Sequence, residues 1–199
     1  MNRGCRVPVR RFVLTGMPGA GKTVLLRRLE MLGYAVVEEA ATDVIALEQA
    51  RENAEPWLRP GFIDSIVDLQ RRRQVAAGDR SGDVAGVQLY DRSPVCTLAL
   101  CRFQGFSPSP ALEAELARIA AEGVYQRRVL FVRGLGFIAR TQARQISFED
   151  ALRFERLHEE AYRELGFECV DVVPGTIEER CGFVHGLCAG TSSGSGSDV

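Results

Sequence analysis

The chain has 199 residues, a formal net charge of −1 at pH 7 and a sequence pI of about 6.2. This length predicts one domain with a sizeable hydrophobic core. The balanced charge argues against a nucleic-acid-binding surface, which normally carries a basic excess, and no apolar run approaches the roughly 18 residues of a membrane span. We therefore expect neither nucleic acid nor a membrane as a partner.

Five short apolar runs that favour β-structure alternate with segments whose apolar residues recur at helical spacing. Strands are expected over residues 11–15, 34–37, 87–90, 129–132 and 168–172. Helices are expected over residues 22–32, 40–51, 61–76, 94–101, 110–122, 148–165 and 177–188. This alternation predicts an α/β fold in which a five-stranded parallel sheet carries helices on both faces.

The two ends of the chain differ in composition from the rest. Residues 1–9 form an N-terminal extension that is charged but has no apolar core, so it does not resemble a signal peptide. Residues 191–199, TSSGSGSDV, are typical of a flexible tail, which leaves residues 10–190 as the domain. The six cysteines include no C-x-x-C pair, which favours reduced thiols and a cytoplasmic location.

The segment GMPGAGKT, residues 16–23, lies between the first expected strand and the first expected helix, and it matches G-x-x-x-x-G-K-[ST]. Lys22 is the only lysine in a chain that otherwise uses arginine for positive charge. A compact ammonium fits between nucleotide phosphates, whereas a planar guanidinium is wider. Backbone N–H groups of such a loop and of the following helix surround the phosphates. We expect a nucleotide to contact Gly16, Pro18, Gly19, Ala20, Gly21, Lys22, Thr23 and Val24.

Phosphoryl transfer also needs a metal ion, and two residues are candidates for binding Mg²⁺. The Thr23 hydroxyl directly follows the motif lysine. Asp91 follows the third expected strand, and a parallel sheet delivers the carboxyl ends of its strands to the ligand crevice. We expect Arg92, the next residue, to bind a phosphate on the substrate side. The alternative is that Asp91 only caps the helix beginning at Pro94.

Two acidic residues, Glu38 and Glu39, follow the second expected strand at the same crevice. A carboxylate there can accept a proton from a substrate hydroxyl. Strand alternation turns only one of the two toward the site, and Asp43 lies one helical turn after Glu39. We prefer Glu39 with Asp43 as the substrate-binding cluster and Glu39 as a catalytic residue. Acids placed at a helix N-terminus for dipole reasons explain the pattern equally well.

Three further features lie in the C-terminal half. Arg140 and Arg144 are four residues apart and are expected as catalytic residues on a lid over the transferred phosphate, although arginines are also common on surfaces. Residues 173–176 follow the last strand, where a nucleotide base can stack, but a capping box between Thr176 and Glu179 explains this loop as well. The two histidines, His158 and His185, are expected on helix surfaces.

These features in this order resemble AAA-family ATPases, specifically the P-loop kinase-like proteins related to the ribosylnicotinamide kinase domain. The marks are GMPGAGKT, residues 33–41 (GYAVVEEAA), residues 90–93 (YDRS), residues 145–151 (QISFEDA) before residues 155–159 (ERLHE), and residues 174–180 (PGTIEER). The resemblance implies a kinase-type P-loop NTPase fold, ATP with Mg²⁺ as cofactors, and a substrate side lined by Glu39. It also implies that Gly175 and Thr176 border the adenine.

Two functional classes follow. A Mg²⁺-dependent kinase would transfer the γ-phosphate of ATP to a hydroxyl of a small, nucleoside-like acceptor. The alternative is an ATPase or nucleotide-dependent switch that acts through a protein partner; a GTPase is disfavoured because no N-K-x-D motif is present. The sequence is compatible with a monomer or a homodimer.

Overall fold

The computed structural model describes residues 8–16, 18–59, 61–80, 82, 84, 86–134 and 148–190. Of the predicted N-terminal extension only residues 8 and 9 are described, and the predicted tail lies outside the described residues. Five strands form one sheet: β1 (Arg10–Thr15), β2 (Ala35–Val37), β3 (Val87–Asp91), β4 (Arg128–Val132) and β5 (Glu168–Val172). They lie in the order β2-β3-β1-β4-β5, and every neighbouring pair is parallel. The predicted five-stranded parallel sheet is confirmed.

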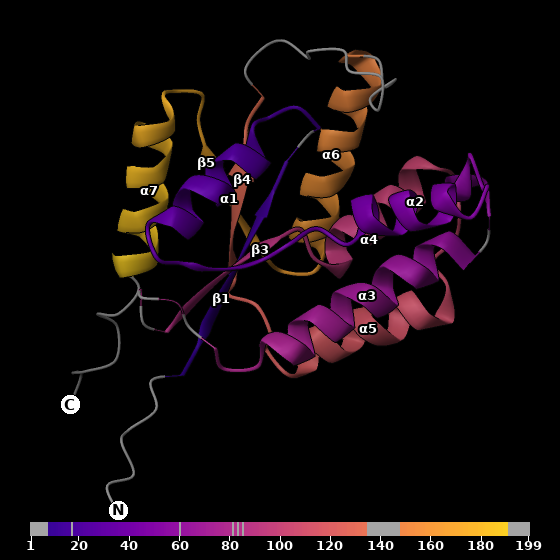
Figure 1. The fold of residues 1–199 in the computed structure, drawn as a ribbon, viewed down its shortest axis with the longest axis horizontal. Coiled ribbons are helices and arrows are strands. Elements are labelled where there is room, and N and C mark those ends of the chain that lie inside the picture. The colour runs from indigo at the N-terminus through magenta and orange to yellow at the C-terminus, as the bar shows by residue number, and fades with distance from the viewer. Residues whose placement is uncertain are drawn as a thin grey trace, which may run out of the picture.

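The described residues also form seven α-helices and one 3₁₀-helix, η1 (Pro56–Leu58); α7 follows the last strand, and the others precede it in the chain. The α-helices are α1 (Lys22–Met31), α2 (Ala41–Ala50), α3 (Gly61–Ala77), α4 (Pro94–Phe103), α5 (Pro110–Ala121), α6 (Phe148–Glu164) and α7 (Ile177–Gly190). Helices α1 and α7 pack together on one face of the sheet, while α3, α4, α5 and α6 lie on the other (Figure 1). Each α-helix begins and ends within two residues of its expected bounds.

Alternation along the central strand builds two apolar layers. In β1, Val13 packs into the layer that includes α3, α4 and α5, whereas Phe12 and Leu14 pack into the layer that includes α1 and α7. All three side chains are fully buried. A strand buried on both faces needs a continuous apolar run, which is what this segment of the sequence provides. Among the described residues, no helix combines the length and apolar character of a membrane span.

The strand order determines where a ligand can bind. β1 lies between β3 and β4, so connections leave it toward both halves of the sheet. Such a reversal opens a crevice beyond the carboxyl ends of the strands. The register pairs Leu14 with Asp91 on one side and with Leu130 on the other. The loop after β1 therefore emerges between the ends of β3 and β4.

Candidate active site

The glycine-rich loop after β1 is shaped by close backbone approach. Gly16 has a φ of 130°, and a Cβ atom there would lie 2.2 Å from the carbonyl oxygen of Val132 in β4. Only glycine allows this approach. Gly21, in the left-handed region with a φ of 82°, precedes α1, and no described side chain caps that helix. Its first N–H groups are therefore free of side-chain caps at the site where a phosphate would bind.

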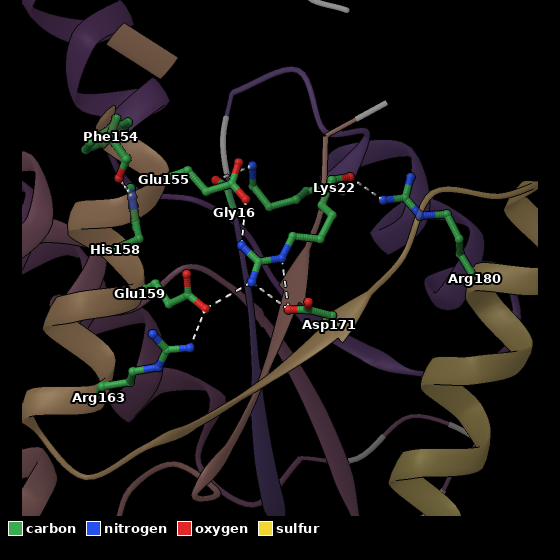
Figure 2. Close-up of polar contacts among 10 residues, drawn as sticks. Gly16, Lys22, Phe154, Glu155, His158, Glu159, Arg163, Asp171 and Arg180 are labelled. Atoms are coloured by element: carbon green, nitrogen blue, oxygen red, sulfur yellow. Dashed lines mark hydrogen bonds and ion pairs between the residues drawn. The ribbon is translucent and has the colours of Figure 1, made fainter. Parts of the chain in front are cut away.

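Lys22 lies inside the site, and its side chain folds back along the loop. It is only 8% exposed, and its Nζ donates a hydrogen bond to the Gly16 carbonyl oxygen at 3.1 Å (Figure 2). Burial, together with the nearby positive charge of Arg92, lowers the pKa of Lys22 to about 7. When burial has lowered the pKa of an ammonium group to near 7, an anion that binds beside the group strongly stabilises its charged form. This is the electrostatic condition expected of a phosphate-binding lysine.

Asp91 and Arg92 follow one another at the end of β3. One carboxylate oxygen of Asp91, Oδ1, is buried and has no hydrogen-bond partner among the described residues. Burial raises the pKa of Asp91, against the attraction of Arg92. The alternative role for Asp91, capping α4, is wrong, because the Ser93 side chain accepts the hydrogen bond from the backbone N–H of Val95. The carboxylate is thus left to face the crevice.

Arg92 forms an ion pair with Glu39 across the ends of β3 and β2. Its Nε lies 2.6 Å from Oε1 of Glu39, and the Thr42 hydroxyl donates to the other oxygen, Oε2, at 2.8 Å. Burial pushes the pKa of Glu39 upward, but the charge of Arg92 and the Thr42 hydrogen bond hold it below its ordinary value. Glu39 is therefore ionised at neutral pH. Glu39 and Arg92, both predicted as site residues, are brought together by the fold.

The neighbouring acidic residues are held by other arginines. Glu38 is exposed and pairs with Arg27, whereas Glu39 pairs with Arg92. Alternation predicts that only one of the two faces the site, but both carboxylates line the smaller cavity described below. Asp43 pairs with Arg73, which also donates to the backbone carbonyl oxygens of Glu38 and Glu39. Arg73 thereby ties α3 to the junction between β2 and α2.

His158 is the main departure from the sequence-based expectation. It is fully buried on α6, not on a helix surface, and its ring contacts the Phe154 carbonyl oxygen at 2.8 Å and Nη1 of Arg92 at 2.9 Å. Burial, with the charge of Arg92, holds the pKa of His158 well below its ordinary value. His185, by contrast, lies at the surface as expected and contacts the Tyr34 hydroxyl at 2.8 Å.

Two arginines at the other side of the loop, Arg133 and Arg180, were not predicted as site residues, although Arg180 ends the segment PGTIEER. Arg180 of α7 is buried, and its Nη1 and Nη2 donate to the Ala20 carbonyl oxygen at 3.0 and 3.1 Å. Nη2 also reaches the carbonyl oxygen of Arg133, 3.3 Å away. The Arg133 guanidinium itself is held by carboxylates of α6 and β5 (Figure 2): Glu155, Glu159 and Asp171.

Two cavities meet at Thr23 and Glu39. The larger, of about 1180 Å³, begins at the glycine-rich loop and continues between α2, α3 and α4. Besides loop residues it is lined by the charged side chains Glu39, Glu55 and Arg92, by the apolar side chains Ala41, Ile45, Ala54, Trp57, Phe62, Ile66, Leu100, Phe103 and Phe154, and by Gln49, Gln70, Cys96, Thr97 and Gln104. The smaller, of about 170 Å³, is lined by Thr23, Leu26, Arg27, Val36, Glu38, Glu39, Asp43 and Asp91. Asp43 borders the smaller cavity only.

The residues present fit a magnesium ion. Thr23 and Asp91 line the same small cavity, and Asp91 offers a buried oxygen without a hydrogen-bond partner among the described residues. The described residues contain no cluster of three or more ligands of the kind that encloses a metal by protein alone. Mg²⁺ bound with a nucleotide typically uses one or two protein oxygens together with phosphates and water.

The remaining predicted site residues lie apart from this centre. Gly175 and Thr176 are exposed before α7, and Thr176 forms the capping box with Glu179: its N–H and hydroxyl donate to Oε2 at 2.8 and 3.0 Å. The capping interpretation of this loop is confirmed, and contact with adenine stays a prediction. Arg140 and Arg144 lie outside the described residues, so their place on a lid also stays a prediction.

Comparison with known proteins agrees with this geometry. Residues 11–180 match the model of an AAA domain family, and no curated protein matches the sequence. One similar solved structure is the NadR protein in complex with NAD and AMP-PNP (TM-score 0.60, 16% identity), which aligns over 96% of this chain and 52% of that chain. Deoxyadenosine kinase from M. mycoides has a TM-score of 0.58 at 13% identity, over 90% of this chain and 99% of that chain. Shikimate kinase from Acinetobacter baumannii has a TM-score of 0.56 at 14% identity, over 94% of this chain and 97% of that chain. The predicted kinase-type P-loop fold is confirmed.

Proposed function

Because the chain belongs to the AAA domain family and has a P-loop kinase fold, we propose that it is an ATP-dependent phosphotransferase. It moves the γ-phosphoryl group of ATP to a hydroxyl of a small, uncharged, nucleoside-like acceptor. The observation that carries the proposal is one cavity lined both by the phosphate-binding loop and by the Glu39–Arg92 ion pair. Phosphate donor and hydroxyl acceptor can meet there without crossing bulk solvent.

The nucleotide is held by the loop from Gly16 to Val24 and by the N-terminus of α1. Lys22 lies among these groups and gains a full positive charge when the phosphates enter, because their charge opposes the effect of burial on its pKa. The base of the nucleotide is assigned to the loop at Gly175 and Thr176. Arg140 and Arg144 are assigned to the closing of the site over the phosphates.

Thr23 and Asp91 would hold Mg²⁺. Bound there, the ion would neutralise negative charge on the β- and γ-phosphates. Asp91 suits this role because its buried Oδ1 accepts no hydrogen bond from the described residues. The rise in its pKa through burial indicates a carboxylate that gains from a cation beside it.

Glu39 acts as the catalytic base. Its lowered pKa keeps it ionised at neutral pH, so it can accept the proton of the acceptor hydroxyl. The hydroxyl oxygen then forms the new bond to phosphorus while the bond to the ADP oxygen breaks. Arg92 orients Glu39 and lies where it can also contact the acceptor or the moving phosphoryl group. Asp43 is assigned to the edge of the site.

The lining of the larger cavity supports an uncharged acceptor with a flat, apolar body. Trp57, Phe103 and Phe154 supply aromatic walls. The Thr97 hydroxyl donates to Oε1 of Gln70 at 2.9 Å, which places hydrogen-bonding groups on the same walls. Arg92, the one arginine among the described lining residues, is already bound to Glu39 and His158. A nucleoside fits these walls better than a carboxylate or a phosphorylated acceptor.

The decisive experiment measures ADP release from ATP with Mg²⁺, alone and with matched pairs of nucleosides and nucleoside monophosphates, together with sugars. Release stimulated by an uncharged nucleoside and lost in Lys22→Ala is the expected result. Stimulation by a monophosphate only would overturn the acceptor class. Slow hydrolysis indifferent to every acceptor would overturn the kinase and favour an ATPase or nucleotide-dependent switch that acts through a protein partner.

A further inference from the structure

We infer that His158 is a positioning residue of the phosphotransferase site, one that fixes Glu39 by holding Arg92. The inference rests on the proposed function in that it takes Glu39 as the base. His158 touches neither Glu39 nor the glycine-rich loop in the described contacts; it acts through a guanidinium that bridges α6 to the end of β2.

The two partners of the imidazole determine its tautomer. Nδ1 lies 2.8 Å from the Phe154 carbonyl oxygen, which can only accept, so Nδ1 carries the proton (Figure 2). Nε2 lies 2.9 Å from Nη1 of Arg92, which can only donate, so Nε2 offers its lone pair. The ring is therefore neutral, with its proton on Nδ1. Its complete burial and its contact with the cationic Arg92 both lower the pKa of the ring and so favour the neutral form.

The backbone conformation of Arg92 is unusual and depends on the contacts that hold the residue in place, including the contact with His158. Its φ of 70° lies in the left-handed region, which is uncommon for a residue with a side chain and persists only where neighbouring contacts fix it. The backbone N–H of Arg92 donates to the Leu14 carbonyl oxygen at 3.0 Å, and this hydrogen bond fixes the main chain against β1. The side chain is fixed by Glu39 at Nε and by His158 at Nη1. Without His158, the guanidinium loses one of its two described side-chain partners and Glu39 loses a fixed partner.

The spacing on α6 explains why a histidine can occupy this position. Phe154, His158 and Tyr162 are four residues apart and form one buried stripe, and the Tyr162 hydroxyl lies 2.7 Å from the Ser93 hydroxyl. The stripe packs against α4, immediately after Arg92 in the chain. An apolar residue at position 158 would fill the space but could not accept a hydrogen bond from Arg92. A polar acceptor is therefore required by the site rather than by the core.

The experiment compares His158→Leu, which removes the acceptor atom, with His158→Gln, whose amide oxygen can take the place of Nε2. Leu157→Ala, a neighbouring loss of packing on the same helix, is the matched control for stability. We expect kcat for phosphoryl transfer to fall by about tenfold in His158→Leu, with KM for ATP unchanged, and most of the rate to return in His158→Gln. Equal losses in His158→Gln and His158→Leu would overturn the inference, and so would a comparable loss in Leu157→Ala.

Two measurements by NMR do not depend on turnover. In the wild-type protein the ¹⁵N shifts of His158 should report a neutral ring protonated at Nδ1 between pH 5 and 8. Titration of the ring in that range, or a proton on Nε2, would overturn the inference. The pKa of Glu39, followed with ¹³C-labelled glutamate, should rise in His158→Leu and stay in place in His158→Gln. If these results hold while no acceptor stimulates the wild-type protein, the proposed function fails and the positioning of Glu39 stands.

Discussion

The guanidinium of Arg180 holds the Ala20 carbonyl oxygen with two hydrogen bonds, so α7 supports the glycine-rich loop from a point 160 residues away in the sequence. Arg180 has no carboxylate partner among its described contacts, and burial lowers its pKa. Its remaining hydrogen bond goes to the carbonyl oxygen of Arg133 at the end of β4. The loop, β4 and α7 are thus joined through one side chain.

Arg180→Met should weaken nucleotide binding with little change in the transfer step. Removal of the guanidinium leaves the Ala20 carbonyl oxygen without its partner and frees the loop, which corresponds to an increase of about tenfold in the Kd for ATP. Titration with a fluorescent ATP analogue measures this change. Arg163→Met is the matched control, because Arg163 is exposed and pairs with Glu159 on α6. Equal affinity in the two variants would show that the contact with Ala20 does not shape the loop.

Glu39→Gln should abolish transfer and spare ATP binding. The amide keeps the shape of the side chain but cannot accept the proton of the acceptor, and loss of a general base typically lowers the rate by about 10²–10⁴. Acceptor-dependent ADP release and ATP affinity are measured on the same preparation. Glu164→Gln, on an exposed part of α6 and paired with Arg102, should behave as the wild type. A similar loss in both variants would remove Glu39 from its catalytic role.

Asp91→Asn should raise the Mg²⁺ concentration needed for half-maximal activity. The substitution keeps the size of the side chain but removes the charge that would attract the ion beside Thr23. A magnesium titration of ADP release at fixed ATP gives the midpoint, and Asp68→Asn on the exposed face of α3 is the control. An unchanged midpoint in Asp91→Asn would place the metal elsewhere.

Gly16→Ala should destabilise the fold and prevent nucleotide binding. The added methyl group would lie 2.2 Å from the Val132 carbonyl oxygen, and its three nearest atoms are all backbone atoms of Val132, which cannot move aside as a flexible side chain could. Overpacking of this kind costs about 1–3 kcal/mol in the free energy of unfolding, occasionally more. Gly182→Ala in α7, where nothing lies within 4 Å of the new Cβ, should leave stability unchanged or raise it by up to about 1 kcal/mol. Chemical denaturation distinguishes the two.

The lowered pKa of Lys22 makes stability depend on pH in a definite direction. Between pH 7 and pH 10.5 the unfolded chain holds a proton on Lys22 that the folded, nucleotide-free chain does not, so this residue makes the free energy of unfolding rise with pH. Lys22→Met removes that dependence. The stability advantage of Lys22→Met over the wild type should therefore shrink as the pH is raised from 7 to 9. An advantage that stays constant would mean that the ammonium keeps an ordinary pKa in the fold.

The sequence predicted those parts of the site that depend on local order along the chain. GMPGAGKT lies between strand and helix, and Glu39, Asp91 and Arg92 follow strands whose carboxyl ends meet at one edge. Alternation predicted that only one of Glu38 and Glu39 faces the site, whereas both line the smaller cavity, with different arginine partners. The helices were predicted from periodicity and from start and stop signals in the sequence, and among the described elements only η1 had no expected counterpart.

The parts that depend on tertiary neighbours could not be predicted in this way. Neither Arg133 nor Arg180, the last residue of PGTIEER, was predicted as a site residue, because they bind backbone carbonyl oxygens or carboxylates that only the fold brings close. His158 was assigned to a helix surface from its residue type. The spacing of Phe154, His158 and Tyr162 would have placed it on the apolar stripe of α6. The pairing of Arg92 with Glu39 needed the strand order, which no single segment specifies.

The solitary lysine gives the chain an unusual chemical selectivity. A side-chain amine with a pKa near 7 is largely uncharged just above neutrality and can react with acylating reagents. This protein offers one such amine, and it lies in the phosphate loop. Acylation of a lysine side chain in this protein would therefore modify the glycine-rich loop, and protection of Lys22 from a reagent would measure how much of that site is occupied by a ligand.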